Sequence, residues 1–306
     1  MNVLILNGCW APNIGNAFVN LGLEGIIKKL YPRANVIYSA ELNNSWYFSL
    51  TTPEMVKNNF PITNYYPDID LAIWGGMMLT KEFIDSGGKT FENLSANNVP
   101  ILLIGAGGDK YDEEEKTAVL EFFKGLKNYS IITRDELTYN LYKDTELFDK
   151  LDRGIDCAFF LPEIVKPPEM NYGEFDVECF DRIEVPEIDH EERKIVITHH
   201  EAYGKLPLGY INQPNTLLSE LPYDYINLYA NANSVFTERV HACIVALAYG
   251  NKAILYSKTP RKSLFKEVFG YDVDMQEKLQ SLDMKKFREK KRTVLKTVKK
   301  KIKELI

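Results

Sequence analysis

The sequence predicts an α/β protein with two Rossmann-like, doubly wound domains that face each other across a cleft. Three observations favour this fold class. The chain has 306 residues, more than a single hydrophobic core usually serves. Short runs of Val, Ile and Leu alternate with glycine or polar turns and stretches of helical period, which is typical of βαβ units and a parallel sheet. The same alternation starts again in the second half of the chain.

The first half is expected to form an N-terminal domain over residues 1–165. Its short apolar runs predict strands, and the segments whose apolar residues recur every three or four positions predict helices. The expected strands cover residues 3–6, 36–39, 71–74, 101–104 and 130–133. The expected helices cover residues 15–30 and 113–126, and another short apolar run lies at 156–161.

The second half is expected to form a C-terminal domain over residues 194–282, which a linker over residues 166–193 joins to the first. The linker is predicted because prolines stand there in an acidic, glycine-containing stretch. The second series of strands is expected at residues 194–198, 234–237 and 253–256. A helix is expected at residues 239–249.

Residues 283–306 predict a basic amphipathic helix. The apolar residues that fall on one helical stripe are Phe287, Val294, Val298, Ile302 and Leu305. Of the 37 Lys and Arg residues in the chain, 11 lie between Lys285 and Lys303, where Glu289 is the one acidic residue. The helix is expected either to lie across the acidic body of the protein or to contact an anionic membrane surface.

The composition narrows the classes of function and location. The net charge is −6, and outside residues 285–303 it is −16. A nucleic-acid partner is therefore not expected, because a protein that binds nucleic acid should carry its basic surface on the folded body. No stretch approaches the ~18 uncharged residues of a membrane helix. The four cysteines show no metal-binding spacing. A cytoplasmic protein is expected, with peripheral contact at the inner face of the membrane as an alternative that the basic helix leaves open.

Glycine turns after three predicted strands form the first group of candidate site residues. Doubly wound domains bind ligands where the carboxyl ends of their strands meet the cleft, and glycine lets a backbone approach a ligand closely. The turns are GCWAPNIG at 8–15, Gly75-Gly76, and GAGG at 105–108. None matches a dinucleotide-binding or P-loop pattern, so tight turns without a ligand remain the alternative.

Two later turns resemble each other in sequence. They read SIITRDEL at 130–137 and SVFTERVH at 234–241. In each, an apolar strand runs into a threonine that is expected to cap the following helix. Thr133 and Glu136 have the spacing of a capping box.

Arg134 and Arg239 therefore fall in the first turn of a predicted helix. A cation there opposes the helix dipole at a cost of roughly 0.3–1 kcal/mol, and a bound anion would reverse this cost. Guanidinium groups match the geometry of phosphate and carboxylate, so two arginines at one cleft suit a substrate with two anionic groups. Ion pairs with the neighbouring Asp135 and Glu238 are the alternative.

Histidines supply the candidate acid or base. His241 lies two residues beyond Arg239, where the helix dipole favours a neutral imidazole and a bound anion would favour its protonation. A half-buried structural histidine is the alternative. His199 and His200 follow the predicted strand at 194–198 and are further candidates for the cleft. Adjacent residues point to opposite sides of a strand, so a shared metal is not expected.

An aromatic segment offers a candidate surface for a sugar. Trp46 and Tyr47 stand among asparagines within residues 43–66, and aromatic faces with amide side chains form platforms for sugar rings. An acceptor-binding loop and an insertion packed on its own aromatics are equally consistent with this pattern.

The chain resembles the polysaccharide pyruvyltransferase family, whose members have the two-domain glycosyltransferase-B type architecture. The marks of the resemblance are Asn13-Ile14-Gly15-Asn16, Gly75-Gly76, Gly105-Ala106-Gly107, the segments at 134–138 and 156–161, and Glu238-Arg239-Val240-His241-Ala242. The family usually has Gly-Asp where this chain has Gly15-Asn16, so the carboxylate that a base at position 16 would need is missing here.

The resemblance implies a metal-independent transferase with phosphoenolpyruvate as co-substrate and no other cofactor. Such an enzyme joins pyruvate as a cyclic ketal to a sugar or lipid-linked glycan of a cell-surface polysaccharide and releases phosphate. His241 and Arg239 are then the expected catalytic residues, and Trp46 and Tyr47 the expected acceptor-binding residues. The expected donor-binding residues are Arg134, Arg239, Gly15, Asn16, Gly75, Gly76, Gly105, Gly107, His199 and His200.

Two other functions remain open at this point. One is a glycosyltransferase of the same architecture that uses a nucleotide-sugar donor. The other is a non-catalytic relative that binds a glycan or an anion.

Overall fold

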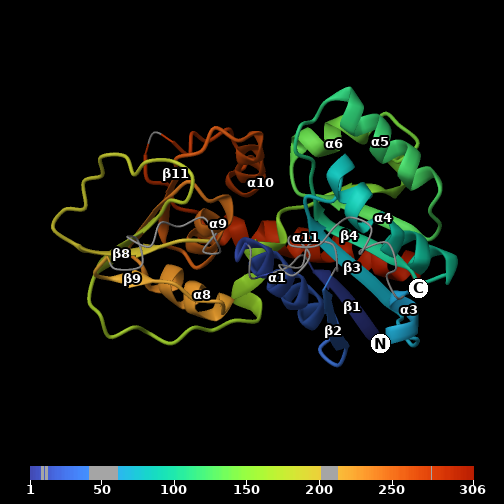
Figure 1. Ribbon diagram of the computed structural model, residues 1–306, viewed down its shortest axis with the longest axis horizontal. Coiled ribbons are helices and arrows are strands. Elements are labelled where there is room, and N and C mark those ends of the chain that lie inside the picture. Colours follow the sequence, from blue (N-terminus) through green and yellow to red (C-terminus); the bar gives the residue numbers. More distant parts are fainter. Residues whose placement is uncertain (8–9, 11–12, 41–60, 201–212, 277) are drawn as a thin grey trace.

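The computed structural model describes residues 1–7, 10, 13–40, 61–200, 213–276 and 278–306. Its two halves each contain a parallel β-sheet, and helices lie beside both sheets (Figure 1). Each predicted strand is present to within two residues at either end. The predicted helix at 15–30 has the same bounds in the structure, as α1 (Gly15–Leu30).

The first sheet has six strands in the order β2-β1-β3-β4-β5-β6. The strands are β1 (Asn2–Asn7), β2 (Asn35–Ala40), β3 (Leu71–Gly76), β4 (Ile101–Ala106), β5 (Tyr129–Thr133) and β6 (Leu151–Arg153). Besides α1, the helices of this half are α3 (Ile62–Tyr65), α4 (Lys81–Ala96), α5 (Glu113–Lys124), α6 (Glu136–Tyr142) and the 3₁₀ helices η3 (Phe148–Lys150) and η4 (Cys157–Glu163).

Helices cover both faces of the first sheet because successive strand residues point in opposite directions. Val3 and Ile5 of β1 join the apolar core that contains the buried side chains of α1. Leu4 and Leu6 join a second core with buried residues of α4 and α5. Both faces of a parallel sheet are thereby buried, which explains its continuous apolar strands.

The second sheet has five strands in the order β11-β10-β7-β8-β9. The strands are β7 (Phe175–Cys179), β8 (Lys194–Thr198), β9 (Thr216–Leu217), β10 (Ser234–Thr237) and β11 (Lys252–Leu255). The helices of this half are α8 (Pro222–Asn231), α9 (Val240–Ala248), the 3₁₀ helix η5 (Pro260–Ser263), α10 (Leu264–Phe269) and the long C-terminal α11 (Met284–Leu305).

The predicted linker over residues 166–193 is wrong where it includes β7. This strand lies between β10 and β8 in the middle of the second sheet. The sequence pattern did not predict β7 because the strand contains acidic residues, whereas a buried strand is expected to be apolar. The fully buried Asp176 accepts a hydrogen bond from Arg193 Nε at 3.2 Å and lies 3.1 Å from His190 Nδ1, so its charge is compensated inside the fold.

The helices α1, η4 and α9 pack against one another and join the two halves in one apolar core. The closest approach involves two glycines of α1. A Cβ atom at Gly22 would overlap the carbonyl of Cys157, and one at Gly25 would lie 2.8 Å from the carbonyl oxygen of Phe160. Only glycine allows the backbones of α1 and η4 to approach this closely.

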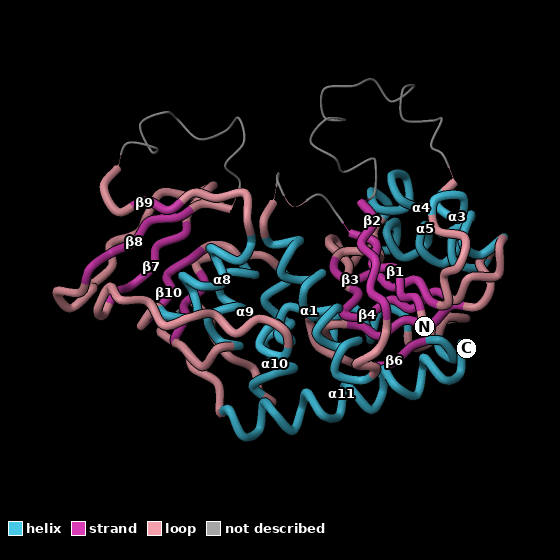
Figure 2. The backbone as a smooth tube through the Cα atoms, turned by 90° about the horizontal axis from the view of Figure 1, so that it is seen from below, coloured by secondary structure: helices cyan, strands magenta, loops and turns pink. Residues whose placement is uncertain are grey.

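The helix α11 extends along one side of the molecule below both halves (Figure 2). Its predicted stripe faces inward: Phe287, Val294, Val298 and Ile302 are buried, and Leu305 packs against the same core. Three inward lysines pair with acidic residues of the body, as Lys290 with Glu267 at 2.7 Å, Lys291 with Glu163 at 2.6 Å and Lys301 with Asp152 at 2.9 Å. The helix therefore lies across the acidic body, as the first of its two expected positions requires.

No helix within the described residues is both long enough and apolar enough to cross a membrane.

Candidate functional site

A cavity of about 520 Å³ lies between the two halves, and residues of both line it. The first half contributes turns that follow β1, β3, β4 and β5, and the second half contributes turns that follow β7, β8, β10 and β11. This is where doubly wound domains bind ligands. The polar residues of the lining are Asn13, Asn16, Asn20, Thr80, Glu82, Asp109, Arg134, Arg182, His200, Glu238, Arg239, His241, Ser257 and Arg261.

The packing of α1, η4 and α9 brings their N-terminal ends together at this cavity. Asn13 and Gly15 lie at the start of α1, Asp156 is the N-cap of η4, and Arg239 is the N-cap of α9. A Cβ atom at Gly15 would lie 2.8 Å from His241 Nδ1. Gly15 therefore makes room for the imidazole of the other half.

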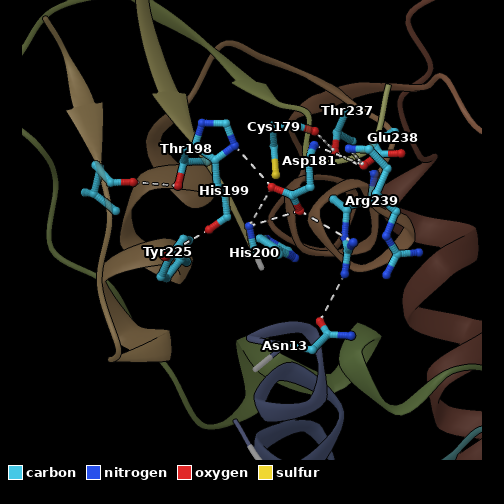
Figure 3. Close-up of polar contacts among 12 residues, drawn as sticks. Asn13, Cys179, Asp181, Thr198, His199, His200, Tyr225, Thr237, Glu238 and Arg239 are labelled. Atoms are coloured by element: carbon cyan, nitrogen blue, oxygen red, sulfur yellow. Dashed lines mark hydrogen bonds and ion pairs between the residues drawn. The ribbon is translucent and has the colours of Figure 1, made fainter. Parts of the chain in front are cut away.

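Asp181 organises the second half of the site (Figure 3). It follows β7, and its side chain is 2% exposed. Its carboxylate lies 3.1 Å from His199 Nδ1, accepts the backbone N–H of His200 at 3.2 Å, and lies 3.5 Å from Arg239 Nη1. Arg239 Nη2 also donates a hydrogen bond to Asn13 Oδ1 at 3.2 Å, so this guanidinium reaches across to the first half.

Arg134 is paired inside the first half of the site. Its side chain is 2% exposed, Nη1 donates to Asp156 Oδ2 at 3.4 Å, and Nε lies 3.6 Å from Asp135 Oδ2. Burial lowers the pKa of Arg134, but Asp156, Tyr111 and Asp135 outweigh burial and raise the pKa. Gly107 leaves the space that this guanidinium occupies, because a Cβ atom there would overlap it.

Asp156 faces His241 across the boundary between the halves. His241 Nε2 lies 3.8 Å from Asp156 Oδ2, and the histidine side chain is 18% exposed while the carboxylate is buried. Burial raises the pKa of Asp156, but contact with His241 and the charge of Arg134 outweigh burial and hold the pKa below its usual range. An ionised carboxylate therefore lies beside the one imidazole that was expected to transfer protons.

The predicted capping box at Thr133 and Glu136 is wrong. Asp135 caps α6, because its carboxylate accepts the N–H of Thr138 at 2.7 Å. Thr133 Oγ1 instead donates to the carbonyl of Asp152 at 3.4 Å. Arg134 consequently precedes α6, and the argument from the helix dipole does not apply to it.

The corresponding turn before α9 also differs from the prediction. Arg239 occupies the N-cap position itself, and Thr237 Oγ1 accepts the N–H of Arg239 at 2.8 Å. His241 is the second residue of α9, close to the positive end of the helix dipole as expected. The structure thus brings Arg134, Arg239 and His241 to one cavity through different local geometry.

Some of the other predicted donor-binding residues line the cavity, and others do not. Asn16, Gly75, Gly76 and His200 line the cavity. Gly15 and Gly107 make room for His241 and Arg134, and Gly105 (φ +67°) allows close packing against Cys157. His199 is turned toward Asp181 and is not part of the lining. Trp46 and Tyr47 lie outside the described residues.

Asp181, Arg182 and Arg261 are among the charged residues of the site that sequence reasoning missed. Asp181 and Arg182 follow β7, which was assigned to the linker, so the turn after that strand was not considered. Arg261 lies five residues after the predicted strand at 253–256, in one of the turns where a ligand is expected. Its position after a predicted strand could therefore have identified it as a candidate site residue.

The described residues contain no cluster of three His, Cys, Asp or Glu side chains placed to hold a metal ion. The cavity is lined by arginines and histidines, which suit an anionic ligand and proton transfer.

Comparisons with known proteins agree with this architecture. A family model described as polysaccharide pyruvyl transferase matches residues 13–257. No curated protein sequence matches the chain. The solved structure of MnaA from S. aureus with UDP has a TM-score of 0.56 at 12% identity, over 96% of this chain and 87% of that chain.

Two further solved structures have the same fold. A putative UDP-N-acetylglucosamine 2-epimerase from Listeria monocytogenes has a TM-score of 0.55 at 10% identity, over 100% of this chain and 90% of that chain. The UDP-GlcNAc 2-epimerase from Methanocaldococcus jannaschii has a TM-score of 0.51 at 13% identity, over 96% and 93%. With the two parallel sheets, these likenesses confirm the predicted α/β fold of glycosyltransferase-B type.

His200 is expected to make the stability of the protein depend on pH. It is buried, with Nε2 2.7 Å from the Tyr229 hydroxyl. Its pKa is held well below the usual range by burial and by the charges of Arg239, His241 and His199. The unfolded chain takes up this proton below about pH 6.5, whereas the folded protein does not, so stability falls as pH decreases.

Denaturant unfolding at pH 7.5 and pH 5.5 tests this expectation. The wild type should lose about 1 kcal/mol more of its free energy of unfolding between these pH values than a His200→Gln variant does. Equal losses in the two proteins would show that His200 titrates alike in the folded and unfolded states.

Proposed function

The chain belongs to the polysaccharide pyruvyl transferase family, and we propose that it transfers a pyruvyl group from phosphoenolpyruvate to two hydroxyls of one sugar. The acceptor is a cell-surface polysaccharide or its lipid-linked precursor, and the products are a cyclic pyruvate ketal and phosphate. The observation that carries this proposal is the meeting of Arg134, Arg239 and His241, from both halves, at one cavity, with the buried Asp156 3.8 Å from His241.

The charge of the cavity suits phosphoenolpyruvate, which carries a phosphate and a carboxylate. Among the described residues, four arginines line the cavity, and the second half supplies three of them: Arg182, Arg239 and Arg261. Arg239 is held against the wall by Asp181 and Asn13, so its guanidinium is oriented before a ligand binds. Such preorganised donors stabilise anions at little cost in reorganisation.

The proposed reaction needs three proton transfers, one to carbon and one from each of the two hydroxyl oxygens. A proton added to the methylene carbon of phosphoenolpyruvate leaves positive charge at the neighbouring carbon, which the first sugar hydroxyl attacks as it loses its own proton. The bond from that carbon to the phosphate oxygen then breaks. The second hydroxyl attacks the same carbon, and its proton leaves with phosphate, so atoms and charges balance.

His241 is the proposed donor and acceptor of these protons. The imidazole is partly exposed to the cavity, and the ionised Asp156 stabilises positive charge on it by electrostatic attraction. A protonated His241 can give its proton to the methylene carbon and recover one from the first hydroxyl. Arg134 donates a hydrogen bond to Asp156 at 3.4 Å and holds that carboxylate in place.

The acceptor is proposed to bind at Trp46 and Tyr47, because aromatic faces stack on sugar rings.

We also propose that α11 contacts an anionic membrane surface, which would bring the cavity near a lipid-linked acceptor. The helix is about 33 Å long, and its apolar stripe is already buried in the core. Its exposed face carries Lys285, Lys286, Arg288, Arg292, Lys296, Lys299, Lys300 and Lys303. Each cation near an anionic surface contributes about 1 kcal/mol of attraction at low salt.

The catalytic role of His241 can be tested with His241→Gln, which keeps hydrogen bonding but cannot transfer a proton. Turnover, measured as phosphate release from phosphoenolpyruvate with a panel of glycans, should fall by roughly 10² to 10⁴, with donor affinity nearly unchanged. His190→Gln makes the same change outside the cavity and should retain the parent rate once its folding is verified. A folded His241→Gln protein with the parent turnover would assign His241 a structural role.

Binding of UDP without phosphate release from phosphoenolpyruvate would favour a nucleotide-sugar transferase instead.

The membrane contact can be tested by reversing charge on α11 without removing the helix, since its buried stripe belongs to the core. The variant changes Arg292, Lys296 and Lys299 to Glu, and the matched control changes the exposed Lys110, Lys124 and Lys127 to Glu. In sedimentation with phosphatidylglycerol vesicles at low salt, the wild type and the control should bind and the α11 variant should not. Equal binding of all three proteins, or no binding by the wild type, would contradict the proposal.

A further inference from the structure

The arginines of the cavity differ in how their charge is compensated. Arg134 is paired with Asp156 and Asp135, and Arg239 with Asp181. Arg261 has no carboxylate oxygen within 4.0 Å among the described residues. Its contacts are to neutral groups: Nε donates to Thr259 Oγ1 at 3.1 Å, and Nη1 lies 3.2 Å from Met77 Sδ.

The fold directs Arg261 into the cavity from the side opposite the first half. It lies in η5, which follows β11, and Thr259 caps this turn by accepting the N–H of Arg261 at 3.3 Å. Because Thr259 also accepts a bond from Nε of the same residue, the side chain has a fixed direction. Met77 belongs to the turn after β3, so the guanidinium spans from one half to the other.

The surroundings of Arg261 disfavour its charge. Burial lowers the pKa of Arg261, and the positive charges of Arg134, Arg239 and Arg182 lower it further against the opposing effect of Asp109. Arginine nevertheless stays protonated in proteins. A partly buried cation without a counterion is costly, and a bound anion would relieve that cost.

On the basis of the proposed function, we propose that Arg261 binds the phosphoryl group of the donor and that Arg239 binds its carboxylate. A phosphate ester carries about two negative charges at neutral pH, more than a carboxylate does. The most negative group should therefore bind where positive charge is least compensated. Arg239 already shares its charge with Asp181 and suits the smaller charge of a carboxylate.

This arrangement has a consequence for the bond that breaks. When the carbon–oxygen bond to phosphate is cleaved, negative charge grows on the departing phosphate, and a guanidinium at that position stabilises it. Arg261 is less buried than Arg134 or Arg239, so phosphate held by it lies nearer to solvent for release.

The test is a binding measurement that does not require turnover. Titration calorimetry of inorganic phosphate should show binding to the wild type, weakening of about 10- to 100-fold in Arg261→Ala, and weakening of less than about 10-fold in Arg261→Lys. Lys262→Ala, at the exposed neighbouring residue, should bind phosphate as the wild type does. Pyruvate, which offers a carboxylate alone, should bind the wild type and Arg261→Ala alike.

The outcomes separate this proposal from the proposed function. Unchanged phosphate affinity in folded Arg261→Ala, or equal loss of phosphate and pyruvate affinity, would overturn the role of Arg261. Loss of phosphate binding in Arg261→Ala supports that role even if the wild type releases no phosphate from phosphoenolpyruvate. If the wild type releases no phosphate and its binding of UDP also depends on Arg261, the role of Arg261 in binding a phosphoryl group is supported. The proposal that phosphoenolpyruvate is the donor is then overturned.

Discussion

The close packing of α1, η4 and α9 is the constraint on which the candidate site depends. Gly22 and Gly25 let the backbone of α1 approach η4 where any side chain would overlap it. The three helices then share one apolar core across both halves of the molecule. Because α1 and α9 begin at the cavity and η4 begins after Asp156, beside His241, their packing fixes the separation between Asp156, Arg239 and His241. A site made of residues from two sheets thus has the rigidity of a single core.

The arginines of the cavity fall into two groups, those paired with a buried carboxylate and those that are not. Asp156 and Asp181 hold Arg134 and Arg239, and these pairs orient side chains more than they attract a ligand, because their charges largely cancel. Arg261 has no carboxylate oxygen within 4.0 Å among the described residues. His241 lies close to Asp156 and lines the cavity. Under the proposed function, orientation, attraction and proton transfer therefore fall to different side chains.

The sequence predicted the parts of the fold and of the site that depend on local pattern. Apolar runs located the strands of both sheets except the short or acidic ones, and the similarity of two turns pointed to Arg134 and Arg239. Pairing between distant residues was not predictable. Asp176 makes β7 acidic in sequence, and only its contacts with His190 and Arg193 explain its burial. Asp181 was not predicted as a site residue because it follows that unpredicted strand. The sequence also allowed Thr133 to cap the next helix, but Asp135 is the capping residue in the structure.

A crystal structure of the protein with phosphoenolpyruvate is the measurement that tests the central claim most directly. The account predicts that the donor binds in the cavity between the two halves, with an anionic group on Arg239 and the methylene carbon about 3–3.5 Å from an imidazole nitrogen of His241. Donor bound outside this cavity, or bound with its methylene carbon turned away from His241, would contradict the account.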